Sequence, residues 1–320
     1  MILRSFASES YKPQFSGHET FPLRYGWLKK AYDAVDRCGS KSVFVNDDAI
    51  ARFGVGKNMV TSMRHWAQSC GIISEDDGDN FSPTPIGEMV FSKDGVDPYM
   101  ENPSTLWLIH WFLSSRPNKT TCYWAFNHFH SSTFERENLV QGLIELAKAQ
   151  QWGRAAAATI KRDVECFVRL YASKVTSAKG SHEDALESPL AELGLIRSTG
   201  RLDGFRFVRG NKPTLNNEIL LYALMDFWDQ QSIDQDGGKA ETISFERIAH
   251  DPGSPGRVFL LSEDDLYGRV QNVEDISEGA IQWSETAGLK QLIRREEIEP
   301  KKIIRIVRSG YRVHETEERA

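Results

Sequence analysis

The chain has 320 residues, of which 40% are hydrophobic and 26% charged, and its formal net charge at pH 7 is −6. This length allows about two domains of ~100–200 residues each, and this balance supports a buried core and excludes wholesale disorder. No apolar run approaches the ~20 residues of a spanning helix, and the first ten residues lack the apolar stretch of a secretory signal. We therefore expect a cytoplasmic protein with no membrane partner. Four isolated cysteines, which give no sign of a disulfide framework or a zinc site, are expected to be reduced; they are Cys38, Cys70, Cys122 and Cys166.

Charge is distributed unevenly along the chain. Residues 1–70 hold ten Lys and Arg against six Asp and Glu, residues 71–110 hold one against eight, and residues 290–312 hold eight against three. Binding to nucleic acid needs local positive charge, which the acidic total does not supply but the two basic ends do. The distribution permits a DNA partner without requiring one.

The first 15 residues lack periodicity, and we expect them to form an arm. Apolar side chains at helical spacing then predict a helix that ends at Gly39. A short extended piece is expected at 41–45, and a short helix after it is expected to turn Ile50 and Phe53 inward.

A glycine turn at 54–56 leads into a helix predicted over 57–70, which Gly71 ends. An acidic turn between two short apolar pieces predicts a β-hairpin directly after this helix, and Thr84 followed by Pro85 begins the next helix. The order helix, glycine turn, helix, hairpin is that of a winged helix-turn-helix, and the hairpin strengthens an assignment that two helices alone would leave weak.

The middle of the chain is predicted to be helical. A Pro- and Gly-rich linker at 95–103 precedes it, residues 104–175 carry helical patterns, and an amphipathic helix is expected at 159–173. The polar stretch 173–187 is the best candidate for a domain boundary.

The same order of elements returns in the C-terminal part. Strand, turn, strand, proline and helix are expected at 193–214, and a capped helix followed by a hairpin at 262–293. The expected fold is therefore mainly α with small β-hairpins, an α+β class, with up to three winged helix-turn-helix modules joined by a helical segment. The predicted domains are an arm with a winged DNA-binding domain at 1–95, a helical middle domain at 96–180 and a C-terminal winged-helix-like domain at 181–320.

The helix over 57–70 is the main candidate for contact with DNA. With its apolar side inward, its outward face carries no acid, and such polar and basic groups contact phosphates or base edges in a major groove. The alternatives are an ordinary amphipathic helix or one used for protein contacts, and the acidic turn at 75–79 would repel a nearby phosphate. The candidate DNA-binding residues on this face are Lys57, Asn58, Thr61, Ser62, Arg64 and His65.

A second polar cluster lies just before the first helix. His18, Glu19 and Arg24 fall within seven residues, and these types can serve as general base, metal ligand and phosphate clamp. Adjacent residues point in different directions on a helix or strand, so the competing hypothesis is a helix-entry motif in which His18 has a structural hydrogen bond.

Other groups have simpler structural explanations. The segment 54–57 lacks the first Gly and the Ser or Thr of a P-loop. The acids at 263–265 stand where the dipole of a helix favours them, and Asp163 and Glu165, beside basic residues, are typical of a solvated face. Arg257 lies in a Ser-Pro-Gly-Arg turn, where it could hold a DNA phosphate or have a purely structural role.

Four blocks of the sequence are distinctive: FSGHETFPLRYGWLKK at 15–30, GVGKNMV at 54–60, GSPGRVF at 253–259 and WSETAGLK at 283–290. Together they resemble the SspB family and span nearly the whole chain. The resemblance implies a DNA-nicking component of a bacterial Ssp-type phosphorothioation defence system, which acts beside a cysteine desulfurase, an ATPase and a sulfurtransferase-like ATP pyrophosphatase. It implies a nick in one strand that gives the sulfur-inserting partners access, but it supplies no catalytic residues.

Two hypotheses follow. The first is a nickase that uses magnesium or manganese, with His18 as general base, Glu19 as metal ligand and Arg24 as phosphate clamp. The second is a non-catalytic winged-helix protein that recruits or positions the modification proteins on DNA or regulates transcription; the lack of a standard nuclease motif favours it. A homodimer is also expected, through apolar pieces at 281–307.

Overall fold

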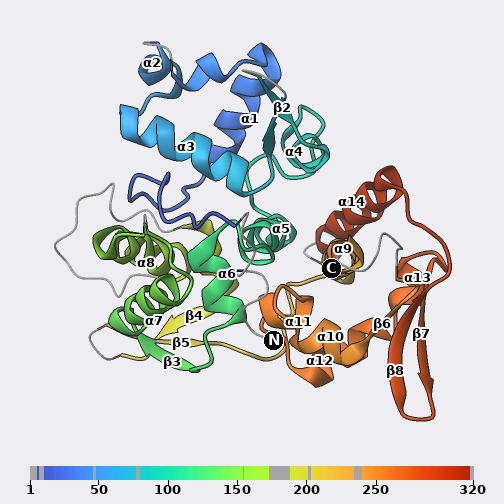
Figure 1. Cartoon of the computed structure of the whole chain (residues 1–320). Coiled ribbons are helices and arrows are strands. Elements are labelled where there is room, and N and C mark those ends of the chain that lie inside the picture. The colour runs from blue at the N-terminus through green and yellow to red at the C-terminus, as the bar shows by residue number, and fades with distance from the viewer. Residues whose placement is uncertain are drawn as a thin grey trace. The chain divides into compact units, whose positions relative to one another are not determined.

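A computed structural model describes two compact units, which interleave along the chain (Figure 1). Unit 1 comprises Met1–Glu101 and Arg116–Val208, and unit 2 comprises Asn102–Ser115 and Arg209–Ala320. None of the helices in the described residues is long and apolar enough to cross a membrane. The residues described are 6, 11–45, 48–76, 80–153, 155–172, 188–200, 203–233 and 240–317.

Unit 1 begins with the predicted order of helices and hairpin. The helix over 57–70 is present, and it buries Val60, Met63 and Trp66 as expected. Two details were wrong: residues 41–44 form a 3-10 turn in place of an extended piece, and Ile50 is 50% exposed while Phe53 is buried. The elements are α1 (Trp27–Cys38), η1 (Lys41–Phe44), α2 (Ala49–Phe53), α3 (Lys57–Ser69), β1 (Ile73–Glu75), β2 (Phe81–Pro83) and α4 (Pro85–Phe91).

Local signals account for this order. The hydroxyl of Thr84 accepts a hydrogen bond from the Gly87 N–H at 2.9 Å and so caps α4, whose first residue is Pro85. β1 and β2 pair antiparallel, with Ser74 opposite Ser82. The hairpin therefore follows α3 directly, as predicted.

The rest of unit 1 is helical with one three-stranded sheet, in the order β3-β5-β4. The amphipathic helix expected at 159–173 is confirmed as α8, with its predicted apolar face buried. Strand β3 was not expected, and the polar stretch 173–187 lies outside the described residues. The elements are α6 (Thr120–Asn127), β3 (Thr133–Glu135), α7 (Arg136–Ala149), α8 (Ala157–Tyr171), η2 (Pro189–Leu193), β4 (Ile196–Ser198) and β5 (Gly204–Phe207).

Unit 2 packs helices beside a second three-stranded sheet, in the order β6-β8-β7. The predicted hairpin is present as β7 and β8, and Ser262 caps α12 by accepting a hydrogen bond from the Asp265 N–H at 3.3 Å. The elements are α5 (Pro103–Ser114), α9 (Asn217–Ile233), β6 (Thr242–Ser244), α10 (Phe245–His250), α11 (Pro255–Val258), α12 (Glu263–Val270), α13 (Val273–Ile276), β7 (Ile281–Thr286), β8 (Leu289–Arg294) and α14 (Pro300–Glu317).

One topological pattern occurs three times. In both three-stranded sheets the earliest strand pairs with the last strand of the following hairpin, and helices lie between them in sequence. The N-terminal hairpin shows a shorter version of this pattern. There, a single antiparallel bridge from Ser40 to Asn80, just before β2, takes the place of the pairing with an earlier strand. The fold is therefore an α+β arrangement of helices with small antiparallel sheets.

Candidate functional site

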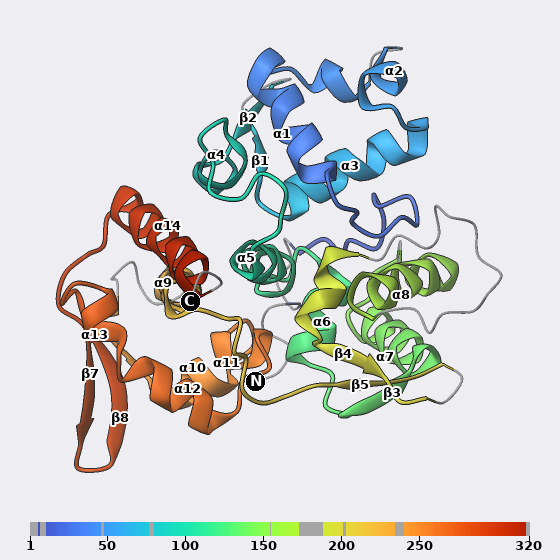
Figure 2. The same cartoon turned by 180° about the vertical axis from the view of Figure 1, so that it is seen from behind.

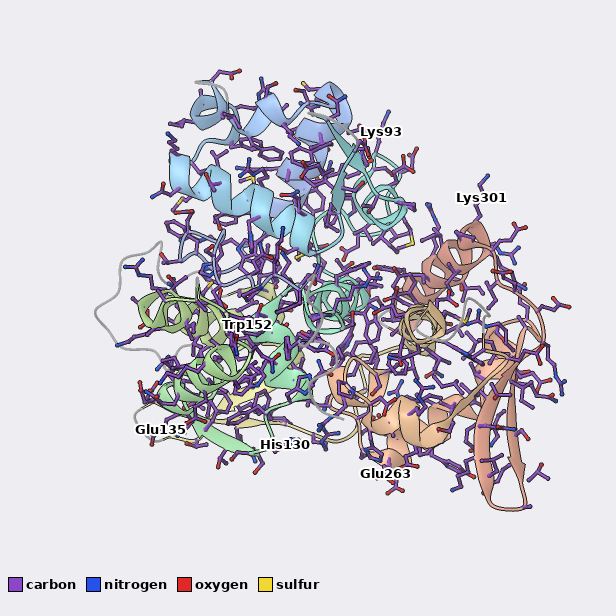
Figure 3. The ribbon with its side chains drawn as sticks, in the orientation of Figure 1. Lys93, His130, Glu135, Trp152, Glu263 and Lys301 are labelled. Atoms are coloured by element: carbon purple, nitrogen blue, oxygen red, sulfur yellow. The ribbon has the colours of Figure 1, made fainter. Side chains whose placement is uncertain are left out.

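The segment 11–24 contains the last residues of the predicted arm and continues to the start of the first helix, and we call this segment the arm from here on. It lies within unit 1 between α3 and α8, as both views show (Figures 1 and 2). Its first part is fixed to α6 and the residues before it: the Tyr11 hydroxyl donates to the Pro117 carbonyl at 3.0 Å, and the Gln14 N–H donates to the Thr120 hydroxyl at 2.8 Å. The ring of Trp152 packs against the ring of Tyr11, with centroids 5.3 Å apart (Figure 3). The arm is thus an ordered part of unit 1.

The second half of the arm makes a strained turn. Gly17 has φ 108°, and Glu19 and Thr20 have φ 47° and 65°, in the left-handed region that side chains other than glycine rarely adopt. Each such non-glycine residue costs roughly 1–2 kcal/mol. A β-carbon at Gly17 would also lie 2.4 Å from Nδ1 of His65, so the turn needs glycine there.

Hydrogen bonds from both neighbouring helices hold this turn. The Trp66 indole on α3 donates to the Phe21 carbonyl at 3.0 Å, and the Arg169 guanidinium on α8 donates to the Thr20 carbonyl at 3.1 Å. Backbone strain that persists because its surroundings fix it is a feature of functional sites, although it does not by itself identify one.

The turn directs His18 into a buried contact with Asp163 of α8. Nε2 of His18 lies 2.7 Å from Oδ1 of Asp163, and the two side chains are 6% and 13% exposed. The Thr20 N–H donates to Nδ1 at 3.0 Å. Because Nδ1 accepts a hydrogen bond, the ring proton of the neutral imidazole lies on Nε2, which donates to Asp163. Both ring nitrogens are therefore engaged, and His18 as described is not a free general base.

Further basic groups surround this pair. Burial, reinforced by the charge of Lys119, lowers the pKa of His65 well below its usual value, so His65 is neutral at pH 7. Burial also lowers the pKa of Lys119, which the charge of Asp163 partly opposes. The ammonium of Lys119 donates to Oε1 of Gln14 at 2.7 Å. Asp163 is thus a carboxylate among nitrogen bases.

The nearby thiols do not add reactive groups. Burial raises the pKa values of Cys70, Cys122 and Cys166, so each stays protonated at neutral pH. A protonated thiol is a weak nucleophile and a poor metal ligand. All four cysteines are free, as the sequence predicts.

Glu19 and Arg24 do not join His18 in one compact cluster. Glu19 is exposed, and within the described part of the chain it forms no hydrogen bond or ion pair. The Arg24 guanidinium stacks over Phe21 and Trp27, at 5.6 and 5.5 Å from the ring centroids. Glu19 therefore supplies a carboxylate and Arg24 a cation near the turn. Neither side chain is hydrogen-bonded to His18 or Asp163.

The predicted DNA-binding face of α3 is corrected at one position. Ser62 was expected to face outward, but it is fully buried, because the arm covers it and its hydroxyl lies 3.5 Å from the Phe21 carbonyl. Lys57 and Asn58 are exposed. The remaining predicted residues are half-buried, and they are Thr61, Arg64 and His65.

Arg257, the predicted DNA contact in unit 2, lies on the one-turn helix α11. It is half-buried, and burial lowers the pKa of its guanidinium. Arg257 and the neighbouring Gly256 both line a pocket in unit 2, so the Ser-Pro-Gly-Arg turn is both structural and open to a cavity.

The donor set limits the metal that this chain could hold. Within the described residues no three His, Cys, Asp or Glu side chains form a group able to bind a metal ion. His18 has no free nitrogen, and the buried thiols are protonated. What remains is one or two carboxylates with water, a set that fits magnesium, which keeps several waters and often uses one or two protein carboxylates.

Sequence reasoning missed three members of this site. Asp163 was weighed and assigned to a solvated face, and Lys119 and Arg169 were not considered. The partners of His18 and Thr20 lie 145 and 149 positions away in the chain. The one local signal was the position of Asp163 next to the buried Val164 on the amphipathic helix.

Comparison with known proteins identifies the family. Residues 15–308 match the family described as "Protein of unknown function (DUF4007)". A magnesium ion-bound SspB crystal structure is similar with a TM-score of 0.80 and 29% identity over 98% of both chains, and another SspB crystal structure has a TM-score of 0.78 and 30% identity over 96% of both chains. No curated protein matches the chain. We conclude that the chain is an SspB-like member of the DUF4007 family.

Proposed function

We propose that this chain binds duplex DNA and nicks one strand as part of a bacterial phosphorothioation system, with a magnesium- or manganese-assisted site at the strained turn of the arm. The observation that carries the proposal is the buried pair of His18 and Asp163, which the strained turn holds between α3 and α8. The likeness to SspB over nearly the whole chain, including a magnesium-bound structure, supports it.

We further propose that the recurring topology represents winged helix-turn-helix modules. Winged domains contact DNA through the helix before the hairpin, and in the N-terminal module this helix is α3. Its exposed Lys57 and Asn58, with Arg64, would bind phosphates and base edges. The acidic hairpin turn is a weaker obstacle than its sequence suggests, because Glu75 forms an ion pair with Lys41.

The chemistry that we propose divides the work among four residues. His18 positions Asp163 by donating a hydrogen bond to it, a role that fits its two engaged nitrogens better than that of the base first expected. Asp163 and Glu19 are the carboxylates that would hold the metal with water, which requires the exposed side chain of Glu19 to turn toward Asp163 when the metal binds. Arg24 would bind the phosphate. When bound, the metal would supply Lewis-acid stabilisation of the phosphoryl oxygens and activation of water.

Relaxation of supercoiled plasmid tests the proposal. The parent protein is expected to convert supercoiled to open-circular DNA with magnesium or manganese and to stop when chelator is added. Glu19→Gln and Arg24→Ala are expected to slow this conversion, while Asp36→Asn on α1, an exposed acid outside the site, is the matched control. Nicking at the parent rate by both site variants would refute the site.

The second candidate function is recruitment of the modification proteins without catalysis, or regulation of transcription. The observation that favours it is the engaged state of His18, both of whose ring nitrogens already take part in hydrogen bonds. Tight DNA binding by the parent protein with no nicking under any divalent metal would select this function.

We also propose that the chain forms a homodimer and works with the sulfur-transfer and ATPase proteins of the pathway. The apolar set at 281–307 is divided: Leu292 and Ile306 are buried in the core of unit 2, whereas Leu289 is 54% exposed on the hairpin. Only its exposed members are available for pairing. Light scattering at micromolar concentration is expected to give the dimer mass, and a monomer with and without DNA would remove the idea.

A further inference from the structure

A pocket of about 410 Å³ lies within unit 2, in a part of the molecule remote in sequence from the arm. It opens beside the segment that follows β5, the end of α10, α11 and the start of α12. A volume of this size accommodates a small ligand. The charged and titratable residues that line it are Arg209, Arg257, His250 and Glu263.

Two arginines meet in this pocket. Both line it, and Nη1 of Arg209 donates to the carbonyl of Gly256, the residue before Arg257, at 3.4 Å. Burial, together with the charge of Arg257, lowers the pKa of Arg209. Nη1 of Arg209 donates to the Leu261 carbonyl at 2.8 Å, which fixes that side chain to the pocket wall. Within the described part of the chain, neither guanidinium is in an ion pair with a carboxylate. Like charges held together without a counter-ion are unfavourable unless a ligand supplies the opposite charge.

The Arg257 side chain carries an unused donor. Its Nε is buried and has no hydrogen-bond partner, a costly state for an N–H group. The backbone around Arg257 is closely packed: a β-carbon at Gly256 would lie 2.5 Å from the Ala249 carbonyl oxygen, so only glycine allows α11 to approach α10 this closely. This packing fixes the backbone that carries Arg257 against α10, beside the pocket.

The one carboxylate on the pocket wall is at its rim. Glu263 lies on the outer side of α12 (Figure 3), its side chain is 67% exposed, and it pairs with Nε2 of His250 at 3.1 Å. It therefore leaves the two arginines uncompensated at the inner wall and weakens, without cancelling, the attraction for an anion.

We propose that this pocket binds a phosphate-class anion between Arg209 and Arg257. A guanidinium presents a planar fork of N–H donors that matches phosphate oxygens, and two forks provide more donors than one phosphate needs. Two sources share this chemistry, the backbone of DNA and a free phosphate or pyrophosphate. Anion binding here is independent of nicking and is measured without it.

Calorimetric titration of the full chain with inorganic pyrophosphate at constant ionic strength tests the site. Saturable binding is expected in the parent, weakened about tenfold or more in Arg257→Gln. Glu263→Gln is expected to tighten binding about twofold, because it removes a like charge near the anion. Arg247→Gln on α10 is the matched control, since Arg247 already pairs with Asp251 at 3.0 Å and does not line the pocket.

Duplex DNA binding distinguishes the two sources. If the pocket takes a backbone phosphate, Arg257→Gln lowers the slope of log affinity against log salt by about one, and pyrophosphate competes with DNA. If it takes free phosphate, DNA binding is unchanged while pyrophosphate no longer binds. The proposal is overturned if Arg257→Gln, folded as judged by an unchanged thermal midpoint, alters neither pyrophosphate binding nor DNA binding.

Discussion

Nε2 of His18 and Oδ1 of Asp163 lie 2.7 Å apart, although the two residues are 145 positions apart in the chain. The contact joins the arm to α8, and the hydrogen bond from the Thr20 N–H to Nδ1 fixes which nitrogen carries the proton. A carboxylate oriented by an imidazole in a mostly buried setting resembles the support that proteins give to metal ligands and bases. This relationship is the basis of the first prediction.

Replacing Asp163 by Asn is expected to reduce plasmid nicking about 100-fold or more, because it removes the carboxylate charge that the proposed chemistry needs. The amide oxygen of Asn can still accept the hydrogen bond from His18, so the fold is expected to survive. The measurement is the initial rate of plasmid relaxation alongside the thermal midpoint.

Glu165→Gln is the matched control, since Glu165 is an exposed acid on the same helix. It is expected to nick at nearly the parent rate. If Asp163→Asn also kept the parent rate, Asp163 would have no part in the chemistry.

Much of the fold was predictable because its signals are local. The cap at Thr84 and the apolar spacing of α3 and α8 depend on neighbours a few residues away, and all of them are confirmed. Strands β3 and β6 were not predicted: each has three residues, and each is stabilised by a partner strand that lies far along the chain. No window of the sequence contains that information.

The candidate site was predictable only at its strained turn. The cluster around His18 was found from the density of polar residues, but its partner Asp163 could not be, because only folding brings α8 to the arm. The burial of Ser62 was missed for the same reason, since periodicity gives the direction of a side chain on α3 but not the arm that covers it. That Arg209 and Arg257 line one pocket likewise depends on the tertiary fold.

Replacing Gly17 by Ala is expected to destabilise unit 1 by about 2 kcal/mol or more and to lower nicking with it. The backbone there has φ 108°, and the new β-carbon would lie 2.4 Å from Nδ1 of His65. Positive-φ strain alone costs roughly 1–3 kcal/mol. Thermal or denaturant unfolding measures the change.

The same substitution at Gly268 should have the opposite sign. Gly268 lies within α12, and a β-carbon there meets nothing within 4 Å. A gain of about 0.5–1 kcal/mol is expected, because alanine favours the helix. Equal effects at Gly17 and Gly268 would show that the arm turn is not constrained as described.

The α3 surface is expected to bind DNA through Lys57 and Arg64. Replacing both by Ala should weaken duplex binding and lower the slope of log affinity against log salt by about one for each phosphate that is no longer bound. Arg37→Ala, an exposed arginine at the end of α1, is the control. An unchanged affinity and slope in a double variant with the parent's thermal midpoint would remove α3 from the DNA interface.

Protonation of a buried histidine should limit stability in acid. His110 on α5 is fully buried, and its Nε2–H donates to the Val258 carbonyl at 2.8 Å. Burial is the main cause that lowers its pKa from 6.5 to about 3. Between these two values the unfolded chain binds a proton that the folded chain does not, so the free energy of unfolding falls as pH falls.

At pH 5 the loss from His110 is about 2 kcal/mol relative to pH 7, since each pH unit below 6.5 costs about 1.36 kcal/mol. His110→Gln keeps an N–H donor for the Val258 carbonyl but cannot titrate. Whatever its stability at pH 7, its free energy of unfolding should therefore fall less between pH 7 and pH 5 than that of the parent. Burial also lowers the pKa of His65 in unit 1, so this residue likewise lowers the free energy of unfolding as pH falls. Since His65 is unchanged in the variant, its contribution is the same in both proteins. Denaturant unfolding at the two pH values measures the difference. Equal losses in the parent and in His110→Gln would mean that His110 is not held neutral in the folded protein.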